Sequence, residues 1–337
     1  MKPEDRFVEK LRALLPPAPG IRLGPGDDAA VVEWAAGLLA ATTDMLVEGV
    51  DFLPGEDPER LGRRAVAVNL SDLAAMGAQP ELFLLTIAFP GNEREDFPLD
   101  VARGAIARAG EFGAHLAGGD LSAAPARIVS VAAWGRLSGE PLTRGGASPG
   151  DRVFVSGNLG DAAAGLRVAK RLAAGENDRG PRSPGLSAEH RKRLLDAYRD
   201  PVPRVALGLA LARQGLASAA IDVSDGLGLD AGRLARASGA RVVLEGDRLP
   251  ISPALVSFGV VEAIDPVDLA VSGGDDYELL FTVPAAAAGR LGALAAEIGI
   301  PVTDIGGIEA GSGAVLRGRD GERDVAGLGH DHLEAAP

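Results

Sequence analysis

Short apolar runs of strand length alternate along this chain with longer segments rich in Ala and Leu. The runs with the Val, Ile and Phe content of buried strands are residues 37–45, 81–89, 127–137, 151–157, 219–224, 240–246 and 277–284. The segments of helical length between them are residues 57–77, 160–175, 203–215 and 284–299. This alternation predicts an α/β or α+β fold. Turn residues at 145–151 separate two α/β blocks, so we expect an N-terminal domain over residues 1–146 and a C-terminal domain over residues 147–337.

The most sharply bounded element is the helix predicted over residues 57–77. Asp57 is the expected N-cap, Pro58 suits the first helical position, and Gly77 is the expected stop. Asp72 lies on this helix three residues after Asn69, so the two side chains share a face. By contrast, residues 174–187 are rich in Gly, Pro, Ser and charge and predict a surface loop.

The charge balance limits the partners that the chain can bind. Its 337 residues carry 34 Lys and Arg against 47 Asp and Glu, a formal net charge of −13. A groove for nucleic acid needs clustered Lys and Arg, so we expect no nucleic-acid partner. An acidic chain that binds a polyanion such as ATP needs divalent cations between its carboxylates and the phosphates.

The chain has no cysteine, which excludes disulfides, thiolate nucleophiles and zinc sites built on Cys. No segment approaches the ~18 consecutive apolar residues of a membrane span. The N-terminus shows no cleavage site of a signal peptide. We therefore expect a cytoplasmic protein with no membrane partner.

Aspartates recur at the ends of predicted elements, beside Gly or apolar residues. They are Asp27, Asp28, Asp44, Asp72, Asp120, Asp222, Asp225, Asp275 and Asp276. A single Asp in such a place is usually a cap or a turn residue. Six segments that each place a carboxylate at an element end indicate a set of hard oxygen ligands for Mg²⁺.

Two glycine pairs suggest an internal repeat. Ser71-Asp72 is followed by Gly118-Gly119-Asp120, and at a similar spacing Ser224-Asp225 is followed by Gly273-Gly274-Asp275. The echo favours a duplicated α/β unit. Glycines lack Cβ, so their backbone N–H groups could approach phosphate oxygens closely, although a plain turn is the alternative.

Familiar nucleotide-binding motifs are missing. The chain has no GxxxxGK[ST] loop and no protein-kinase motif set, and the glycines of "GLGLDAG" at 226–232 are misspaced for a dinucleotide loop. No histidine has HExxH spacing. His330 and His332, which flank Asp331, are expected to lie in an ordinary surface tail.

The order of several segments resembles the thiamine-monophosphate kinases. They are "GPGDDAAV", "TTDMLVEGVDF", "AVNLSDLAAMGAQP", "AGGDLS", "LTRGGASPGD", "SGNLGDAAAGL", "AIDVSDGL", "SGGDDYEL" and "DIGGI". The resemblance covers nearly the whole chain. It implies the fold shared with aminoimidazole-ribonucleotide synthetase, with an N-terminal domain whose strands form a dimer-spanning β-barrel and a C-terminal α/β domain. It also implies a homodimer that uses ATP, several Mg²⁺ ions and thiamine monophosphate to make thiamine diphosphate.

The resemblance implies a role for each matching residue. The positions that match magnesium ligands are Asp28, Thr42, Thr43, Asp44, Asp72, Asp120, Asp222 and Asp225. Those that match nucleotide contacts are Phe112, Gly119, Asp120, Arg144 and Ser224. Those that match substrate contacts are Asp51, Asp275 and Gly327. Among them, we expect turnover to depend most on Asp44, Asp222 and Arg144.

Four of these positions depart from the family pattern. Asp51 stands where the family often has His near the thiamine phosphate, and Asp275 stands where Glu is common. Gly327 replaces an aromatic residue that can pack on the substrate, and Phe112 replaces a more usual Tyr. Asp51 in particular changes the charge that faces the substrate phosphate.

The expected chemistry is direct in-line transfer without a general base. The acceptor is a phosphate monoester with a second pKa of about 6, so it is largely a dianion at neutral pH.

Other ATP-using members of the superfamily are the first alternative function. The absence of cysteine counts against selenophosphate synthetase and the hydrogenase-maturation dehydratase. The purine-pathway synthetases lack the "TTDMLVEGVDF" pattern. A non-catalytic protein that binds nucleotide or thiamine phosphate is the second alternative, and the many carboxylates argue against it.

Overall fold

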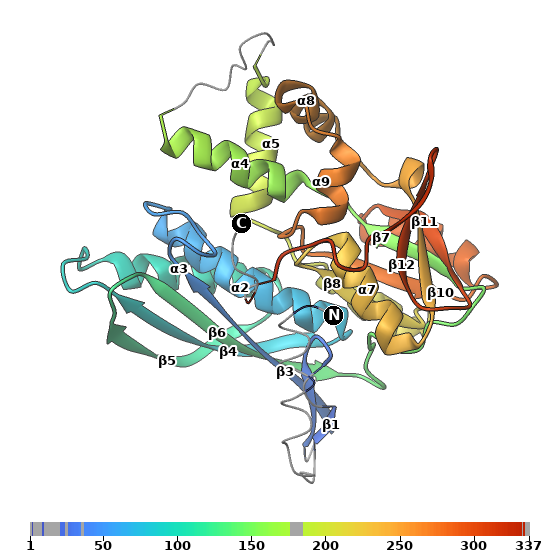
Figure 1. The fold of residues 1–337 in the computed structure, drawn as a ribbon. Coiled ribbons are helices and arrows are strands. Elements are labelled where there is room, and N and C mark those ends of the chain that lie inside the picture. Colours follow the sequence, from blue (N-terminus) through green and yellow to red (C-terminus); the bar gives the residue numbers. More distant parts are fainter. Residues whose placement is uncertain are drawn as a thin grey trace.

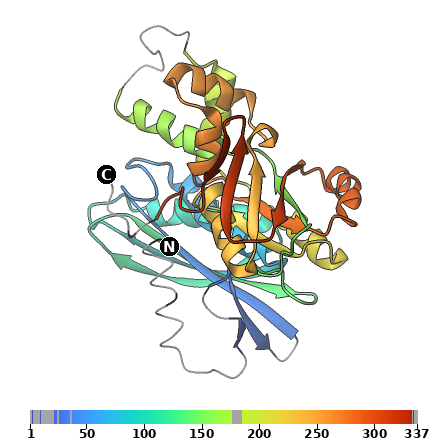
Figure 2. The ribbon, with the colours of Figure 1, turned by 45° about the vertical axis from the view of Figure 1, so that its right-hand side comes forward.

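The computed structural model describes residues 2, 9, 21–23, 26–34, 37–175, 185–331 and 333. Its helices and strands form two α/β blocks, each built on one sheet (Figures 1 and 2). This confirms the predicted α/β or α+β class. Most of the loop predicted over 174–187, and His332, lie outside the described residues. Among the described helices, none combines the length and the apolar character that a membrane span requires.

In the first block, the described residues form a sheet with the strand order β1-β2-β3-β6-β4-β5. Its strands are β1 (Ile21–Leu23), β2 (Ala30–Trp34), β3 (Gly37–Val47), β4 (Gln79–Phe89), β5 (His115–Ala123) and β6 (Ile128–Leu137). Only β4 and β5 pair in parallel. Helices α2 (Pro58–Ala75) and α3 (Phe97–Glu111) pack together over one face of this sheet (Figure 1).

In the second block, the strand order is β13-β12-β9-β11-β7-β10-β8. Its strands are β7 (Arg152–Ser156), β8 (Ala219–Val223), β9 (Arg241–Glu245), β10 (Glu278–Val283), β11 (Val302–Glu309), β12 (Gly313–Gly318) and β13 (Gly321–Asp324). Its α-helices are α4 (Asp161–Ala173), α5 (Ala188–Arg199), α6 (Val205–Gln214), α7 (Leu227–Ser238), α8 (Pro253–Glu262), α9 (Pro266–Ser272) and α10 (Leu291–Ile298). Two short 3₁₀ turns are η1 (Gly246–Arg248) and η2 (Ala288–Arg290).

Helix α2 is the element that joins the two blocks. Its N-cap is Asp57, whose side chain accepts a hydrogen bond from the Arg60 backbone N–H at 3.0 Å, and Gly77 follows its end with φ of +68°. The helix contacts β3, β4 and β6 of the first sheet and β8 and β10 of the second. One hydrophobic core therefore runs across both blocks, from Leu70 and Leu73 of α2 to Leu279 and Phe281 of β10.

The structure confirms the predicted strands and most of the predicted helices, with ends that differ by one to two residues. The exception is the segment 284–299, where the α-helix begins only at Leu291, after a turn and η2. The prediction of a duplicated α/β unit is wrong. Ser71-Asp72 lies inside α2 and Gly118-Gly119 inside β5, whereas Ser224-Asp225 follows β8 and Gly273-Gly274 follows α9.

Close contact between α2 and α3 gives a test of this packing. A Cβ at Gly104 would lie 1.8 Å from the Glu59 carbonyl oxygen, whereas Gly110 on the same helix has open space around it. We predict that Gly104→Ala lowers the free energy of unfolding by about 3 kcal/mol, because the helices must separate. Gly110→Ala should be neutral or stabilise by up to about 1 kcal/mol. Urea denaturation of both variants checks this, and a Gly104→Ala effect under about 0.5 kcal/mol would contradict it.

Candidate metal and phosphate site

Three aspartates from three separate segments meet between the two sheets. Asp28 precedes β2, Asp72 lies on α2 and Asp222 lies on β8. Each offers a carboxylate oxygen, and these oxygens all lie within 4.8 Å of one another. Asp28 and Asp222 are buried, with exposed fractions of 7% and 3%. The arrangement is of the kind that holds a hard cation such as Mg²⁺, which prefers oxygen ligands and takes few carboxylates.

Side chains from β3, from α2 and from the segment between β6 and β7 hold the three carboxylates. The Thr42 hydroxyl donates to Asp72 at 2.5 Å, and the Ser71 hydroxyl donates to Asp222 at 2.7 Å. Arg144 binds Asp28 with two hydrogen bonds, from Nε at 3.1 Å and from Nη2 at 2.9 Å. The guanidinium is thus the cation that this structure places directly on the cluster.

The negative charges of the cluster are energetically unfavourable when no metal ion balances them, and the carboxyl pKa values rise as a result. Burial, and then the charge of Asp44, hold the pKa of Asp72 well above its usual range. Burial and the nearby Asp28 do the same to the pKa of Asp222. Next to them, burial and Asp28 raise the pKa of Asp27 to about 7, against the opposing effect of Arg144. Like charges at this spacing therefore favour binding either protons or a cation.

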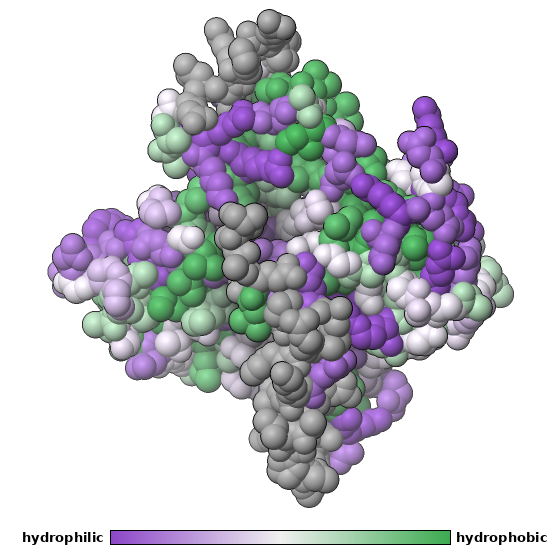
Figure 3. Space-filling model, in the orientation of Figure 1, coloured by the Kyte–Doolittle hydropathy of each residue, from purple (hydrophilic) through white to green (hydrophobic). Residues whose placement is uncertain are grey.

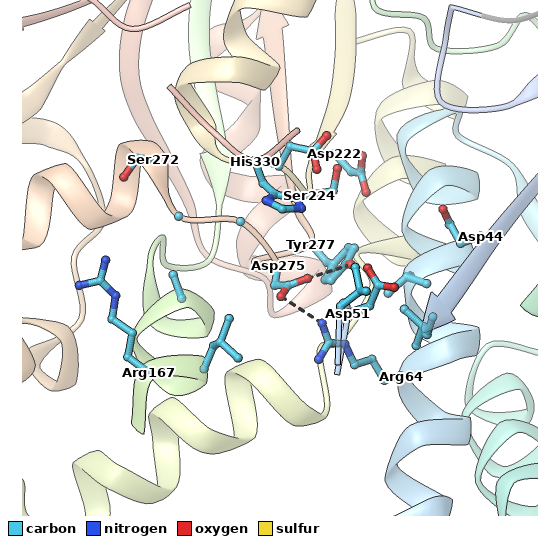
Figure 4. Close-up of a pocket in the computed structure, with 18 of the residues that line it drawn as sticks. Asp44, Asp51, Arg64, Arg167, Asp222, Ser224, Ser272, Asp275, Tyr277 and His330 are labelled. Carbon is cyan, nitrogen blue, oxygen red and sulfur yellow. Dashed lines mark hydrogen bonds and ion pairs between the residues drawn. The ribbon is translucent and has the colours of Figure 1, made fainter. Parts of the chain in front are cut away.

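A pocket of about 450 Å³ opens beside the cluster, and Asp72 and Asp222 belong to its wall. Figure 4 shows its labelled side chains, which come from both blocks. The predicted site residues that line it are Asp44, Asp51, Asp72, Asp222, Ser224, Asp225 and Asp275. Asp44 is held by Asn69, whose side-chain oxygen accepts from the Asp44 backbone N–H at 3.1 Å.

The loop between α9 and β10 carries unusual backbone angles. Asp275 and Tyr277 have φ of +71° and +49°, which residues with a Cβ rarely adopt. Two backbone hydrogen bonds fix the loop to β8 and the turn after it, from Asp275 N–H to the Ser224 carbonyl at 2.7 Å and from Tyr277 N–H to the Val223 carbonyl at 2.8 Å. Local strain of this kind is concentrated at functional sites, where surrounding contacts maintain it.

The Ser224-Asp225 turn is fixed from the helix that follows it. The Asp230 carboxylate accepts from the backbone N–H groups of Asp225 and Gly226 at 3.1 and 3.2 Å. Arg233 then bridges the two carboxylates, at 2.5 Å from Asp225 and 2.9 Å from Asp230. The segment "GLGLDAG", which the sequence does not fit to a dinucleotide loop, therefore starts helix α7 and positions Asp225.

Several predicted site residues lie away from this pocket. Asp120 lies on the exposed edge strand β5, in the row of Thr86, Ser130 and Met45. Because side chains alternate along a strand, this row is on the opposite face of the sheet from Asp44. Gly119 faces the Leu85 backbone, and a Cβ there would lie 1.9 Å from the Leu85 carbonyl oxygen.

Three more of the predicted site residues also lie outside the pocket wall. The Thr43 hydroxyl donates to the Val131 carbonyl at 2.9 Å. Phe112 ends α3 and is partly buried against the hydrophobic core. Gly327 lies in the turn after β13 and has no atom within 4 Å of the place where a Cβ would be.

The pocket also contains residues that the sequence interpretation missed. Arg64 and Tyr277 are in its wall, and so are Arg167 and Lys170 of α4. Figure 3 shows hydrophilic residues gathered over α4 on the face in view. His330 is exposed, as the prediction of a surface tail requires, but it also lines the pocket, and its backbone N–H donates to the Asp225 carbonyl at 2.9 Å. Arg64 could have been found, because it precedes Asp72 by two helical turns and so shares its face.

Comparisons with known proteins agree with the two-block fold. Sequence models described as AIR synthase related protein, N-terminal domain and C-terminal domain, match residues 26–137 and 148–319. Thiamine-monophosphate kinase of Salmonella typhimurium is 38% identical over 304 residues, 89% of this chain and 88% of that protein. The enzyme of the same name from Escherichia coli K12 is 37% identical over 318 residues, 93% of this chain and 92% of that protein.

Solved structures give the same result. AaThiL complexed with AMPPCP and TMP superposes with a TM-score of 0.82 at 30% identity, covering 98% of this chain and 96% of that one. Thiamine-monophosphate kinase from Stenotrophomonas maltophilia K279a gives a TM-score of 0.76 at 38% identity, covering 93% and 96%. The HypE-HypF complex, at 21% identity and a TM-score of 0.72, shares the fold.

The raised carboxyl pKa values predict how stability depends on pH without metal. Asp27 and Asp230 keep a proton in the folded state up to about pH 7, whereas carboxyl groups of the unfolded chain lose it near pH 4. The folded state then binds more protons than the unfolded state, so the free energy of unfolding should fall as the pH rises from about 4 to about 7. Thermal unfolding in EDTA measures this. Stability that rises steadily over that range would contradict it.

Magnesium should oppose this loss of stability at higher pH, because the ion takes the place of the protons on the buried carboxylates. Added Mg²⁺ should raise Tm more at about pH 8 than at about pH 5. Asp72→Asn removes one of the repelling charges. It should therefore raise Tm in EDTA at the higher pH and abolish the response to Mg²⁺. Asp247→Asn, at an exposed position in η1, is the control and should behave as the unmodified protein does.

Proposed function

We propose that this chain, which belongs to the thiamine-monophosphate kinase family of AIR synthase related proteins, transfers the γ-phosphate of ATP to thiamine monophosphate and forms thiamine diphosphate. The relatives of that name match about nine-tenths of the chain, across both blocks. The AaThiL complex with AMPPCP and TMP supports ATP and thiamine monophosphate as the two substrates. One observation in this structure carries the proposal: the buried cluster of Asp28, Asp72 and Asp222 beside a pocket built from both blocks.

The cluster fits Mg²⁺, because its donors are all hard oxygen atoms and its carboxylates are poorly neutralised. Bound Mg²⁺ would neutralise the phosphate oxygens of the nucleotide and the charge that develops during transfer. Asp28, Asp72 and Asp222 would hold it, and Thr42, Asp44 and Asp225 are further ligands expected from the family. Thr43 and Asp120 are also expected from the family, but their side chains lie on the opposite face of the sheet from Asp44 and would not reach this cluster within one chain. Arg144 would then exchange its contact with Asp28 for the nucleotide phosphates.

The remaining family roles belong to the same proposal. Gly119, Phe112 and Ser224 would contact the nucleotide. Asp51, Asp275 and the open space at Gly327 would contact the thiamine substrate. Asp51 is also a turn cap, since its carboxylate accepts from the Val47 backbone N–H at 2.8 Å, so it has a structural role beside any role in binding.

The first sheet supports a homodimer. Its outer side exposes the large apolar side chains of Met45, Leu82 and Leu84, and Leu116 and Leu121 of the edge strand β5 are exposed on the other face. Strand β5 is exposed along its whole length, and among the described residues no strand pairs with its outer edge. We propose that a second copy covers this surface and completes the barrel expected from the family. Such pairing would also bring Asp120, which lies on β5, to a buried position. The cytoplasmic location stays a prediction.

Transfer should need no general base. The acceptor phosphate is its own nucleophile once it is a dianion, and its second pKa is about 6. His330 lines the pocket together with the aspartates, although the expected chemistry gives it no role. A base-free reaction predicts that His330 is dispensable for proton transfer.

We predict that Asp222→Asn lowers kcat by about 10³-fold or more while the fold stays intact, because a neutral amide is a poor Mg²⁺ ligand. Asp44→Asn should also abolish turnover. Circular dichroism and ADP formation should be measured on the same samples, with Asp247→Asn as the control. Near-normal turnover in either pocket variant would refute the assignment of these residues to the metal site.

The choice of acceptor tests the base-free mechanism. ADP formation should be compared for thiamine monophosphate and free thiamine from about pH 5 to 9, with and without His330→Gln. The acid limb of the rate with thiamine monophosphate should lie at or below about pH 6, since Mg²⁺ favours the dianion. Free thiamine, whose alcohol must lose a proton, should react poorly even at saturation. Comparable turnover on thiamine, or loss of the reaction in His330→Gln, would contradict the mechanism.

A further inference from the structure

Arg64 is an arginine buried in the wall of the pocket. It has an exposed fraction of 4% and comes from α2, where it is followed along the same face by Val68 and Asp72, which also line the pocket. Asp72 lies eight positions after Arg64 on the helix, which places their backbones about 12 Å apart. Helix α2 thus presents a cation at one end of the pocket and a ligand of the carboxylate cluster at the other.

Two contacts hold the Arg64 guanidinium in place. Its Nη2 lies 3.0 Å from the Asp275 carboxylate, and its plane lies over the ring of Tyr198, 4.5 Å from the ring centre. Asp275 is itself fixed by its strained loop and by the Tyr277 hydroxyl, which donates to it at 3.2 Å. Figure 4 shows Arg64, Asp275 and Asp51 directed toward the same part of the pocket. The forked pair of N–H donors of the Arg64 guanidinium is therefore oriented before any ligand binds.

One donor of this arginine lacks an acceptor within the part of the chain that the structure describes. Among the described residues, none accepts a hydrogen bond from the buried Arg64 Nε. An unsatisfied buried donor on a charged group is costly unless a ligand supplies its partner. The other cations of the pocket wall, Arg167 and Lys170, are exposed and so hold no fixed direction.

The carboxylates around Arg64 show why an anionic ligand would need this cation in order to bind. Six carboxylates line this pocket: Asp44, Asp51, Asp72, Asp222, Asp225 and Asp275. Metal at the cluster would offset those at one end, but Asp51 and Asp275 lie at the end that Arg64 occupies (Figure 4). A phosphate dianion could enter there only if a fixed cation faced it.

Resting on the proposed function, we propose that Arg64 is a further substrate-binding residue that binds the phosphate group of the acceptor. Its fork suits phosphate oxygens, and Asp275 and Tyr198 hold it in position. The acceptor phosphate would then lie between a fixed guanidinium and the metal cluster. In this chain Arg64 would also offset the negative charge of Asp51.

The test compares two ligands that differ only in the phosphate. Binding of thiamine monophosphate and of thiamine should be measured by calorimetry with Mg²⁺ and no nucleotide. Arg64→Gln should reduce the preference for the phosphorylated ligand by about tenfold or more, while thiamine affinity changes little. Arg64→Lys, which keeps the charge and loses the fork, should give a smaller loss of the same kind, and it serves if Arg64→Gln does not fold.

Arg63→Gln is the matched control. Arg63 is the preceding residue of α2 and pairs with Glu111 and Asp200, away from the pocket. Its variant should keep the preference of the unmodified protein. If the Arg64 variants lose affinity for both ligands equally, Arg64 only supports Asp275 and the proposal is wrong. It is also wrong if they keep the full preference. If the unmodified protein itself shows no preference for thiamine monophosphate, the proposed function fails as well.

Discussion

The site depends on the buried polar residues of helix α2. A helix enclosed between two sheets must find partners for every polar side chain that it buries. Asn69 and Asp72 find theirs on β3, at the Asp44 backbone and the Thr42 hydroxyl. Ser71 finds its partner on β8, at Asp222, and Arg64 finds its own on the loop before β10, at Asp275. These four residues connect both blocks, and their partners include Asp44, Asp222 and Asp275, three of the six aspartates that line the pocket.

This arrangement explains why a strongly acidic pocket is stable enough to form. The hydrophobic core that runs from the first sheet through α2 to β10 supplies the stabilisation, while the polar residues fix the alignment of the two blocks. The carboxylates that they place together repel one another, so the cluster is a site of local instability within a well-packed protein. Groups with strongly perturbed pKa values in a cleft are typical of functional sites, and here a bound cation would relieve the perturbation.

Much of this could be predicted from the sequence, because the relevant signals are local. The Asp57 cap, Pro58 and Gly77 delimit α2, and apolar runs mark the strands. The aspartates at element ends indicate a metal site, since element ends are where a fold presents polar groups. Long-range placement could not be predicted in the same way. The face of β5 that carries Asp120, the return of His330 to the pocket and the positive φ of Asp275 depend on sheet register and loop packing. The false repeat arose because Gly and Asp are common residues that recur in unrelated elements.

The most direct measurement is anomalous diffraction from crystals grown with Mn²⁺ in place of Mg²⁺, together with AMPPCP and thiamine monophosphate. The account predicts an anomalous peak bound by at least two of Asp28, Asp72 and Asp222, with the phosphates of both ligands in the adjoining pocket. Asp72→Asn crystals should lose or weaken that peak. Both ligands bound in the pocket with no ion on these three carboxylates, or an ion held only by carboxylates elsewhere, would contradict the account.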